Sequence, residues 1–136
     1  NSIVQRIYYW KASINMIKEF PFTGIGWRRF GMLYELYRSP SANTSHYSHN
    51  VFLQILVEAG PLGLVSFLLI VVTFLRNGLI VIRNSTEHTA LKVGLFYAGC
   101  VFLIHNVIDL SFYFGQAAFF WWIIAGLFSN FRVENA

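Results

Sequence analysis

The chain has 136 residues, of which 56% are hydrophobic, 18% aromatic and 12% charged, and its formal net charge is +4. A soluble domain carries about 25% charged residues, so this composition excludes an ordinary soluble enzyme and indicates a lipid bilayer. The sequence begins with Asn1 and shows no charged leader with a cleavage site. We therefore interpret it as a piece of a larger polytopic protein.

Residues 3–19 have the pattern of an amphipathic helix. Apolar side chains recur at steps of three and four residues and form one stripe: Ile3, Ile7, Trp10, Ile14 and Ile17. Arg6 borders one edge of this stripe, and Lys11 and Lys18 border the other. The pattern predicts a helix that lies in the membrane interface with cationic flanks. A helix packed against another domain is the alternative.

The next segment is rich in glycine, proline and serine. Pro21 ends the helix, and "PFTGIGWRRFG" is a glycine-punctuated loop without the spacing of a nucleotide-binding motif. We expect the chain to stay polar and irregular through Asn50. Residues 1–50 would then form a periplasmic loop with an amphipathic helix, and residues 51–136 a transmembrane helical region, both within one larger domain.

Three apolar stretches follow. Residues 51–75 would extend about 37 Å as a helix, enough to cross the hydrocarbon core with some tilt, and Gly60-Pro61 predicts a kink. Residues 91–108 and 112–131 are predicted as further spans, joined by a turn short enough to require an antiparallel hairpin. The expected fold is all-α, a polytopic integral membrane bundle with about three spans.

Basic residues near the ends of these stretches predict the orientation. They are Arg76, Arg83, Lys92 and Arg132. Because cytoplasmic loops are enriched in Lys and Arg, we place these four in the cytoplasm. The 109–115 turn and everything before residue 51 then lie outside, which in a bacterium is the periplasm. Arg6, Lys11, Lys18, Arg28, Arg29 and Arg38 also fall outside, so either the topology is inverted or an anionic ligand binds there.

Polar side chains interrupt the chain where it becomes apolar. His49 and Asn50 precede the first span, and a histidine that only caps a helix start is the alternative to a functional one. Glu58 follows His49 by nine residues, about 180° around a helix, so it is not expected to orient the imidazole. It shares a helical face with Gln54. For Glu58 a structural role is favoured over the functional one that intramembrane acids often have.

Two further histidine patterns are present. His46 and His49 are three residues apart and could bind a metal, but a further ligand would have to come from His105 or Asp109, and we predict no metal site. His105 and Asp109 are expected on one face at the outer end of the second span. There the carboxylate could fix the tautomer of this or another histidine, and a helix-end pair without function is the alternative.

Four segments, taken together, resemble a known family. They are "RIYYW" at residues 6–10, "PFTGIGWRRF" at 21–30, "HNVFLQILVEAGPLGL" at 49–64 and "HNVIDLSF" at 105–112. In this order they resemble the C-terminal half of the O-antigen ligase and polymerase family of bacterial inner membranes. Its members are polytopic membrane glycosyltransferases that take a glycan from an undecaprenyl-pyrophosphate carrier and need no metal or nucleotide sugar.

The resemblance implies roles for single residues. Arg6 would engage the pyrophosphate, whose oxygens match a guanidinium fork; contact with lipid headgroups is the alternative. His49 would act as general base. The other site residues expected are Asn50, Arg28, Arg29, His105 and Asp109 for substrate binding and Glu58, Gly60 and Gly63 for structure. No cofactor is expected.

The activity implied is transfer of O-antigen from undecaprenyl pyrophosphate to lipid A–core in lipopolysaccharide biosynthesis, at the periplasmic face of the inner membrane. The expected partners are this donor, lipid A–core or another glycan acceptor, and membrane lipids, with no nucleic acid. An O-antigen polymerase and a protein or teichoic acid glycan ligase are alternatives. From other classes, a transporter or flippase segment would relay protons through His105 and Asp109, and a noncatalytic assembly subunit is also open.

Overall fold

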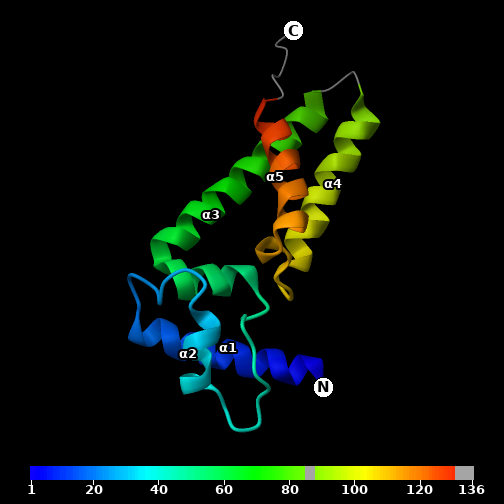
Figure 1. Cartoon of the computed structure of the whole chain (residues 1–136). Helices are drawn as coiled ribbons and strands as arrows, with labels where there is room; N and C mark the ends of the chain where they lie inside the picture. The colour runs from blue at the N-terminus through cyan, green and yellow to red at the C-terminus, as the bar shows by residue number, and fades with distance from the viewer. Residues whose placement is uncertain (85–87, 131–136) are drawn as a thin grey trace. The chain divides into compact units, whose positions relative to one another are not determined.

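The computed structural model describes residues 1–84 and 88–130, and within these residues the fold is helical without strands. The elements are α1 (Ser2–Glu19), α2 (Phe30–Tyr37), α3 (Val51–Asn84), α4 (Thr89–His105), a 3₁₀ turn (Ser111–Tyr113) and α5 (Gly115–Asn130) (Figure 1). The chain divides into two compact units. The first unit contains Asn1–Phe67 with Asn106–Leu110, and the second contains Leu68–His105 with the residues from Ser111 onward.

Helix α1 begins and ends as its sequence predicts. The side chain of Asn1 accepts a hydrogen bond from the backbone N–H of Ile3 at 3.1 Å, and the helix ends one residue before Phe20-Pro21. Its buried face consists of Tyr9, Ala12, Ser13 and Met16. The predicted apolar stripe is divided, because Trp10 and Ile17 pack against this core whereas Ile3, Ile7 and Ile14 are exposed.

Helix α2 corrects the expectation that residues 20–50 are irregular. Phe30 and Tyr34 are four residues apart, both are fully buried, and their rings stack with centroids 5.6 Å apart. The Tyr9 ring meets Tyr34 edge to face at 5.6 Å. One buried stripe thus holds eight residues in a helix that would be too short to persist alone.

Helix α3 contains the predicted kink. Gly60 has φ of 69°, and the chain changes direction there (Figure 1). Pro61 has no N–H to donate to the carbonyl of Val57, so this acceptor needs a partner from elsewhere. The N–H of Ile25 supplies it at 2.8 Å, and the N–H of Gly26 donates to the carbonyl of Glu58 at 3.0 Å.

Two glycines allow the 22–26 loop to lie against the kink. A Cβ on Gly24 would stand 2.6 Å from the carbonyl oxygen of Glu58, and one on Gly60 would stand 2.4 Å from that of Phe22. Both glycines also have positive φ, which other residues rarely adopt. The loop and the kink therefore form one rigid contact.

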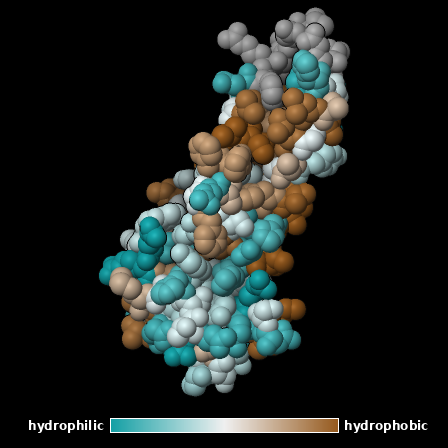
Figure 2. Space-filling view, turned by 45° about the vertical axis from the view of Figure 1, so that its right-hand side comes forward, coloured by the Kyte–Doolittle hydropathy of each residue, from teal (hydrophilic) through white to brown (hydrophobic). Residues whose placement is uncertain are grey.

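The second unit is built on aromatic packing. The ring of Phe74 meets those of Phe96, Trp121 and Phe128, with centroids 5.5 to 5.7 Å apart. Helices α4 and α5 run antiparallel side by side, as predicted (Figure 1). Large apolar side chains also remain on its outside, such as Tyr97, Ile104 and Phe120, and Figure 2 shows hydrophobic residues gathered over these helices.

The described helices differ in how well they fit a bilayer. Helix α3, with 34 residues, is the one described helix that is long and apolar enough to cross, whereas α4 is apolar but has 17 residues. Helix α4 ends at His105 instead of residue 108, because Asn106 leaves the helix and its carbonyl accepts from the N–H of Val51 at 3.0 Å. Arg132 and the end of the predicted third span lie outside the described residues.

Candidate active site

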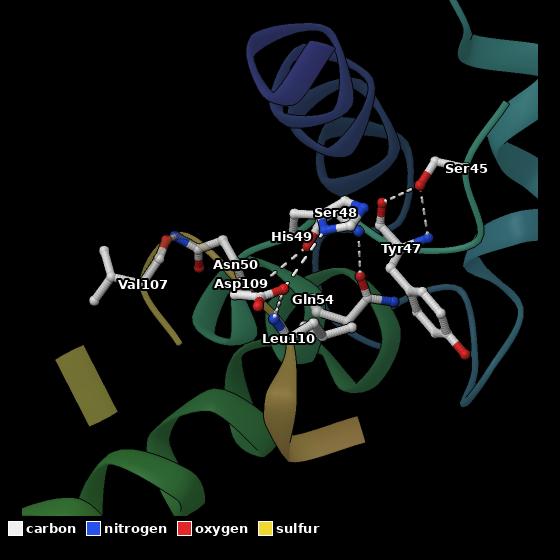
Figure 3. A network of polar contacts seen from close by, with 9 residues as sticks. All are labelled: Ser45, Tyr47, Ser48, His49, Asn50, Gln54, Val107, Asp109 and Leu110. Atoms are coloured by element: carbon white, nitrogen blue, oxygen red, sulfur yellow. Dashed lines mark hydrogen bonds and ion pairs between the residues drawn. The ribbon is translucent and has the colours of Figure 1, made fainter. Parts of the chain in front are cut away.

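The segment before α3 is held by a series of polar contacts. Asn50 is the helix cap, with its side-chain oxygen accepting from the N–H of Leu53 at 2.8 Å, and its amide nitrogen donates to the carbonyl of Val107 at 2.8 Å (Figure 3). Ser48 is fully buried, and its N–H donates to the side-chain oxygen of Gln54 at 2.7 Å. The residues on either side of His49 are thereby fixed.

His49 adopts a backbone conformation that is unusual for a residue with a side chain. Its φ is 55°, in the left-handed region. Such a conformation costs about 1–3 kcal/mol and persists only where neighbours impose it, which occurs disproportionately at functional sites. The bonds of Ser48 and Asn50 impose it here, and the side chain of His49 stays about one-third exposed.

Two groups orient the imidazole of His49. The ring of Tyr9 lies against it, with centroids 5.4 Å apart and an interplanar angle of 29°. Nδ1 of His49 lies 3.8 Å from Oδ1 of Asp109, longer than a hydrogen bond but close enough for electrostatic attraction (Figure 3). The N–H of Leu110 donates to the same carboxylate oxygen at 2.8 Å and fixes its position.

Arg6 shares a pocket with His49. The pocket has a volume of about 230 Å³ and is lined by Ser2, Gln5, Arg6, Tyr9, Asn43 and His49. Nε of Arg6 is buried and has no hydrogen-bond partner among residues 1–84 and 88–130. A buried donor without an acceptor is unfavourable, so the guanidinium is suited to an anionic oxygen supplied by a ligand.

The far wall of this pocket is tied to α1 and α2. The side-chain oxygen of Gln5 accepts from the N–H of Asn43 at 2.7 Å, and the hydroxyl of Tyr34 donates to the carbonyl of Asn43 at 3.2 Å. Burial, followed by the nearby Tyr9, raises the pKa of Tyr34 to about 12. Tyr34 therefore remains a neutral donor at physiological pH.

Glu58 lies beneath the pocket region and is 2% exposed. Its Oε1 accepts from the side chain of Gln54 at 2.9 Å and from the N–H of Phe30 at 3.4 Å. The predicted face shared by Gln54 and Glu58 is therefore present, and the carboxylate faces the first turn of α2, where negative charge is favourable. Gly63 lies on α3, where a Cβ would stand 2.4 Å from that of Ala59.

Other residues predicted for the site lie elsewhere. Arg28 and Arg29 are exposed in the turn before α2 and do not line the pocket. Because α4 ends at His105, the predicted helical face shared by His105 and Asp109 does not form. Asp109 instead faces His49, the other arrangement that the sequence allowed, and substrate binding by His105 stays a prediction.

His46 and His49 do not form a helical pair, because both lie in the irregular segment before α3. A Cβ on Gly31 would stand 2.5 Å from Nδ1 of His46, so His46 lies over α2 while His49 lies over Tyr9. In the part of the chain that the structure describes, no three His, Cys, Asp or Glu residues gather in a way that could hold a metal.

Sequence reasoning missed three side chains that shape this pocket. They are Tyr9, Gln5 and Asn43. The signal available for Tyr9 was its place three residues after Arg6, which puts both on one side of a helix. Gln5 and Asn43 meet across a loop and had no comparable signal.

Comparison with known proteins gives one match. A model of the O-antigen ligase family matches residues 1–68, half of the 136-residue chain. No curated protein matches, and no solved structure matches. The matched residues contain α1, α2, the kink of α3 and both Arg6 and His49. With its long apolar helix this is a membrane protein, and the chain belongs to the O-antigen ligase family.

Proposed function

We propose that this chain forms part of a membrane glycosyltransferase that moves a glycan from undecaprenyl pyrophosphate to an acceptor hydroxyl at the periplasmic face. Ligation of O-antigen to lipid A–core is the reaction we favour. The observation that carries the proposal is the pocket that Arg6 and His49 line together. At about 230 Å³ it is smaller than a typical drug-sized site and suits a pyrophosphate rather than a whole glycan.

In this proposal His49 is the general base. Neutral His49 takes the proton of the acceptor hydroxyl as that oxygen bonds to the anomeric carbon of the donor glycan. Asp109 stabilises the resulting imidazolium, since its carboxylate lies beside Nδ1. A positioned base of this kind contributes about 10²–10⁴-fold to a rate.

Arg6 acts on the leaving group. The bond between the anomeric carbon and the pyrophosphate oxygen breaks, and undecaprenyl pyrophosphate departs with the bonding electrons. The guanidinium of Arg6, whose Nε is buried without a partner in the described chain, stabilises this negative charge where it develops. Asn50 has both side-chain amide atoms in backbone contacts, so we assign it the positioning of His49 rather than direct contact with substrate.

The test is transfer from a lipid-pyrophosphate donor by the full-length protein. His49→Asn removes the base while asparagine tolerates positive φ, so the backbone is retained, and we expect a rate loss of about 10²–10⁴-fold. His46→Ala is the matched control and should be mild. Normal transfer by His49→Asn at normal membrane abundance contradicts the proposal.

The same assay separates the two favoured reactions. Lipid A–core is offered in one arm and a second lipid-linked glycan in the other. A ligase extends the first, and a polymerase extends the second. Product in the second arm alone would replace ligation with polymerisation while keeping the roles of Arg6 and His49.

A further inference from the structure

Four residues of the turn before α2 form an exposed patch outside the pocket: Phe22, Trp27, Arg28 and Arg29. We call it the aromatic–arginine turn. Phe22 is 84% exposed and Trp27 62% exposed, and both arginines are exposed. Residues 20–34 contain these two arginines and no acidic residue. The patch therefore combines large aromatic surfaces with a local charge of +2.

The fold imposes this exposure. Ile25, in the middle of the turn, is buried, and the N–H groups of Ile25 and Gly26 are bonded to the carbonyls of the α3 kink. Arg28 has φ of 58°, a left-handed conformation that is costly for a residue with a side chain. A held and strained turn that presents aromatic rings outward points to a function for those rings.

The turn is fastened at a definite place along α3. Its hydrogen bonds end on Val57 and Glu58, the last helical turn before Gly60-Pro61. Residues 61–84 that follow would extend about 36 Å as a helix, which is enough to cross the hydrocarbon core. The turn therefore adjoins the point where α3 begins its crossing stretch, at the depth of the lipid headgroups.

We propose that the aromatic–arginine turn binds the headgroup layer of an anionic bilayer. Phe22 and Trp27 enter the interfacial layer, where aromatic side chains are favoured, and Arg28 and Arg29 contact lipid phosphates. The charge of the turn complements an anionic surface, and no acid within it competes. This inference requires α3 to cross a bilayer, but it does not require the transfer reaction.

Site-directed spin labelling of the full-length protein tests this contact. Thr23→Cys carries the label in a Cys100→Ser background, which keeps both aromatic side chains, and the protein is reconstituted in phosphatidylcholine with or without phosphatidylglycerol. We expect the label to be more accessible to oxygen than to a water-soluble nickel complex, as at headgroup depth. The matched label at Thr44→Cys, in an exposed loop, should be accessible to the nickel complex.

Two results would overturn the proposal. A label at residue 23 as accessible to the nickel complex as that at residue 44 means that the turn lies in water. A label shielded from both reagents means that another part of the protein covers it. Transfer activity is measured on the same samples, so failure of the lipid contact is distinguishable from failure of the reaction.

The arginines are tested in a second arm. Arg28→Gln with Arg29→Gln should lower the immersed population in the anionic bilayer by about fivefold per arginine and leave the neutral bilayer unchanged. Arg38→Gln is the matched charge control, because Arg38 pairs with Glu35 at 2.8 Å, and it should have no effect. Equal immersion of the double variant and the parent in the anionic bilayer would overturn the phosphate contact.

Discussion

The two units of this chain are stabilised in different ways. The buried polar residues of the described chain all belong to the first unit: Ser13, Ser48, Gln54, Glu58 and Asn106. The second unit is held by rings around Phe74 and by close approach at glycines such as Gly99. Directional bonds fix a group's orientation, whereas ring packing tolerates small shifts. The unit that places reactive groups is accordingly the polar one.

Removing the central ring of the second unit should have the largest effect on stability. Phe74→Ala deletes a 2% exposed side chain that touches three other rings, and such truncations cost about 3–5 kcal/mol. Phe120→Ala, at a 68% exposed position, is the control and should cost far less. Thermal unfolding in nanodiscs measures both. Equal losses would show that the aromatic cluster does not hold this unit.

Adding one methyl group at the kink should disturb the first unit. Gly60→Ala requires alanine at φ of 69° and brings its Cβ to 2.4 Å from a backbone oxygen, so we expect a loss of at least about 1–3 kcal/mol. Gly99→Ala meets the tip of the Phe74 ring instead, and a side chain can move. Gly126→Ala meets nothing within 4 Å and should be neutral or stabilising. Protease sensitivity of residues 20–30 reports the kink contact, and normal resistance in Gly60→Ala contradicts it.

Removing the ring beneath His49 should have a smaller effect, on activity. Tyr9→Leu abolishes the stacking contact, and contacts between rings contribute about 0.5–1.5 kcal/mol, so we expect transfer to fall by about two- to tenfold. Tyr9→Phe keeps the ring and should retain activity. A merely structural role would lower the amount of folded enzyme, so the pH profile of kcat is compared as well. It should shift in Tyr9→Leu and stay unchanged in Tyr9→Phe.

The features that sequence predicted correctly depend on local patterns. Helix α1 follows from spacing along 17 residues, and the kink follows from the chemistry of Gly60-Pro61. Helix α2 was missed because its support comes from Glu58, 28 residues after Phe30. The end of α4 was misplaced because Asn106 bonds to Val51, across 55 residues. Contacts of this range leave no periodicity in a sequence.

The candidate site divides in the same way. His49 was identified from its position at a polar-to-apolar boundary and from family resemblance. Its neighbours were not, since Tyr9 and Asp109 reach it from 40 and 60 residues away along the chain. Asp109 had been paired with His105 on the assumption of a continuous helix, and that helix ends four residues too early.

The central claim is that Arg6 holds the pyrophosphate while His49 acts on the acceptor in the same pocket. The most direct measurement is the affinity of the full-length protein for an undecaprenyl-pyrophosphate glycan, compared with its transfer rate. Arg6→Lys keeps the charge but loses the guanidinium fork, and we expect affinity to fall about ten- to hundredfold. His49→Asn should bind the donor normally and fail to transfer it. Normal donor binding by Arg6→Lys, or lost binding by His49→Asn, would contradict the account.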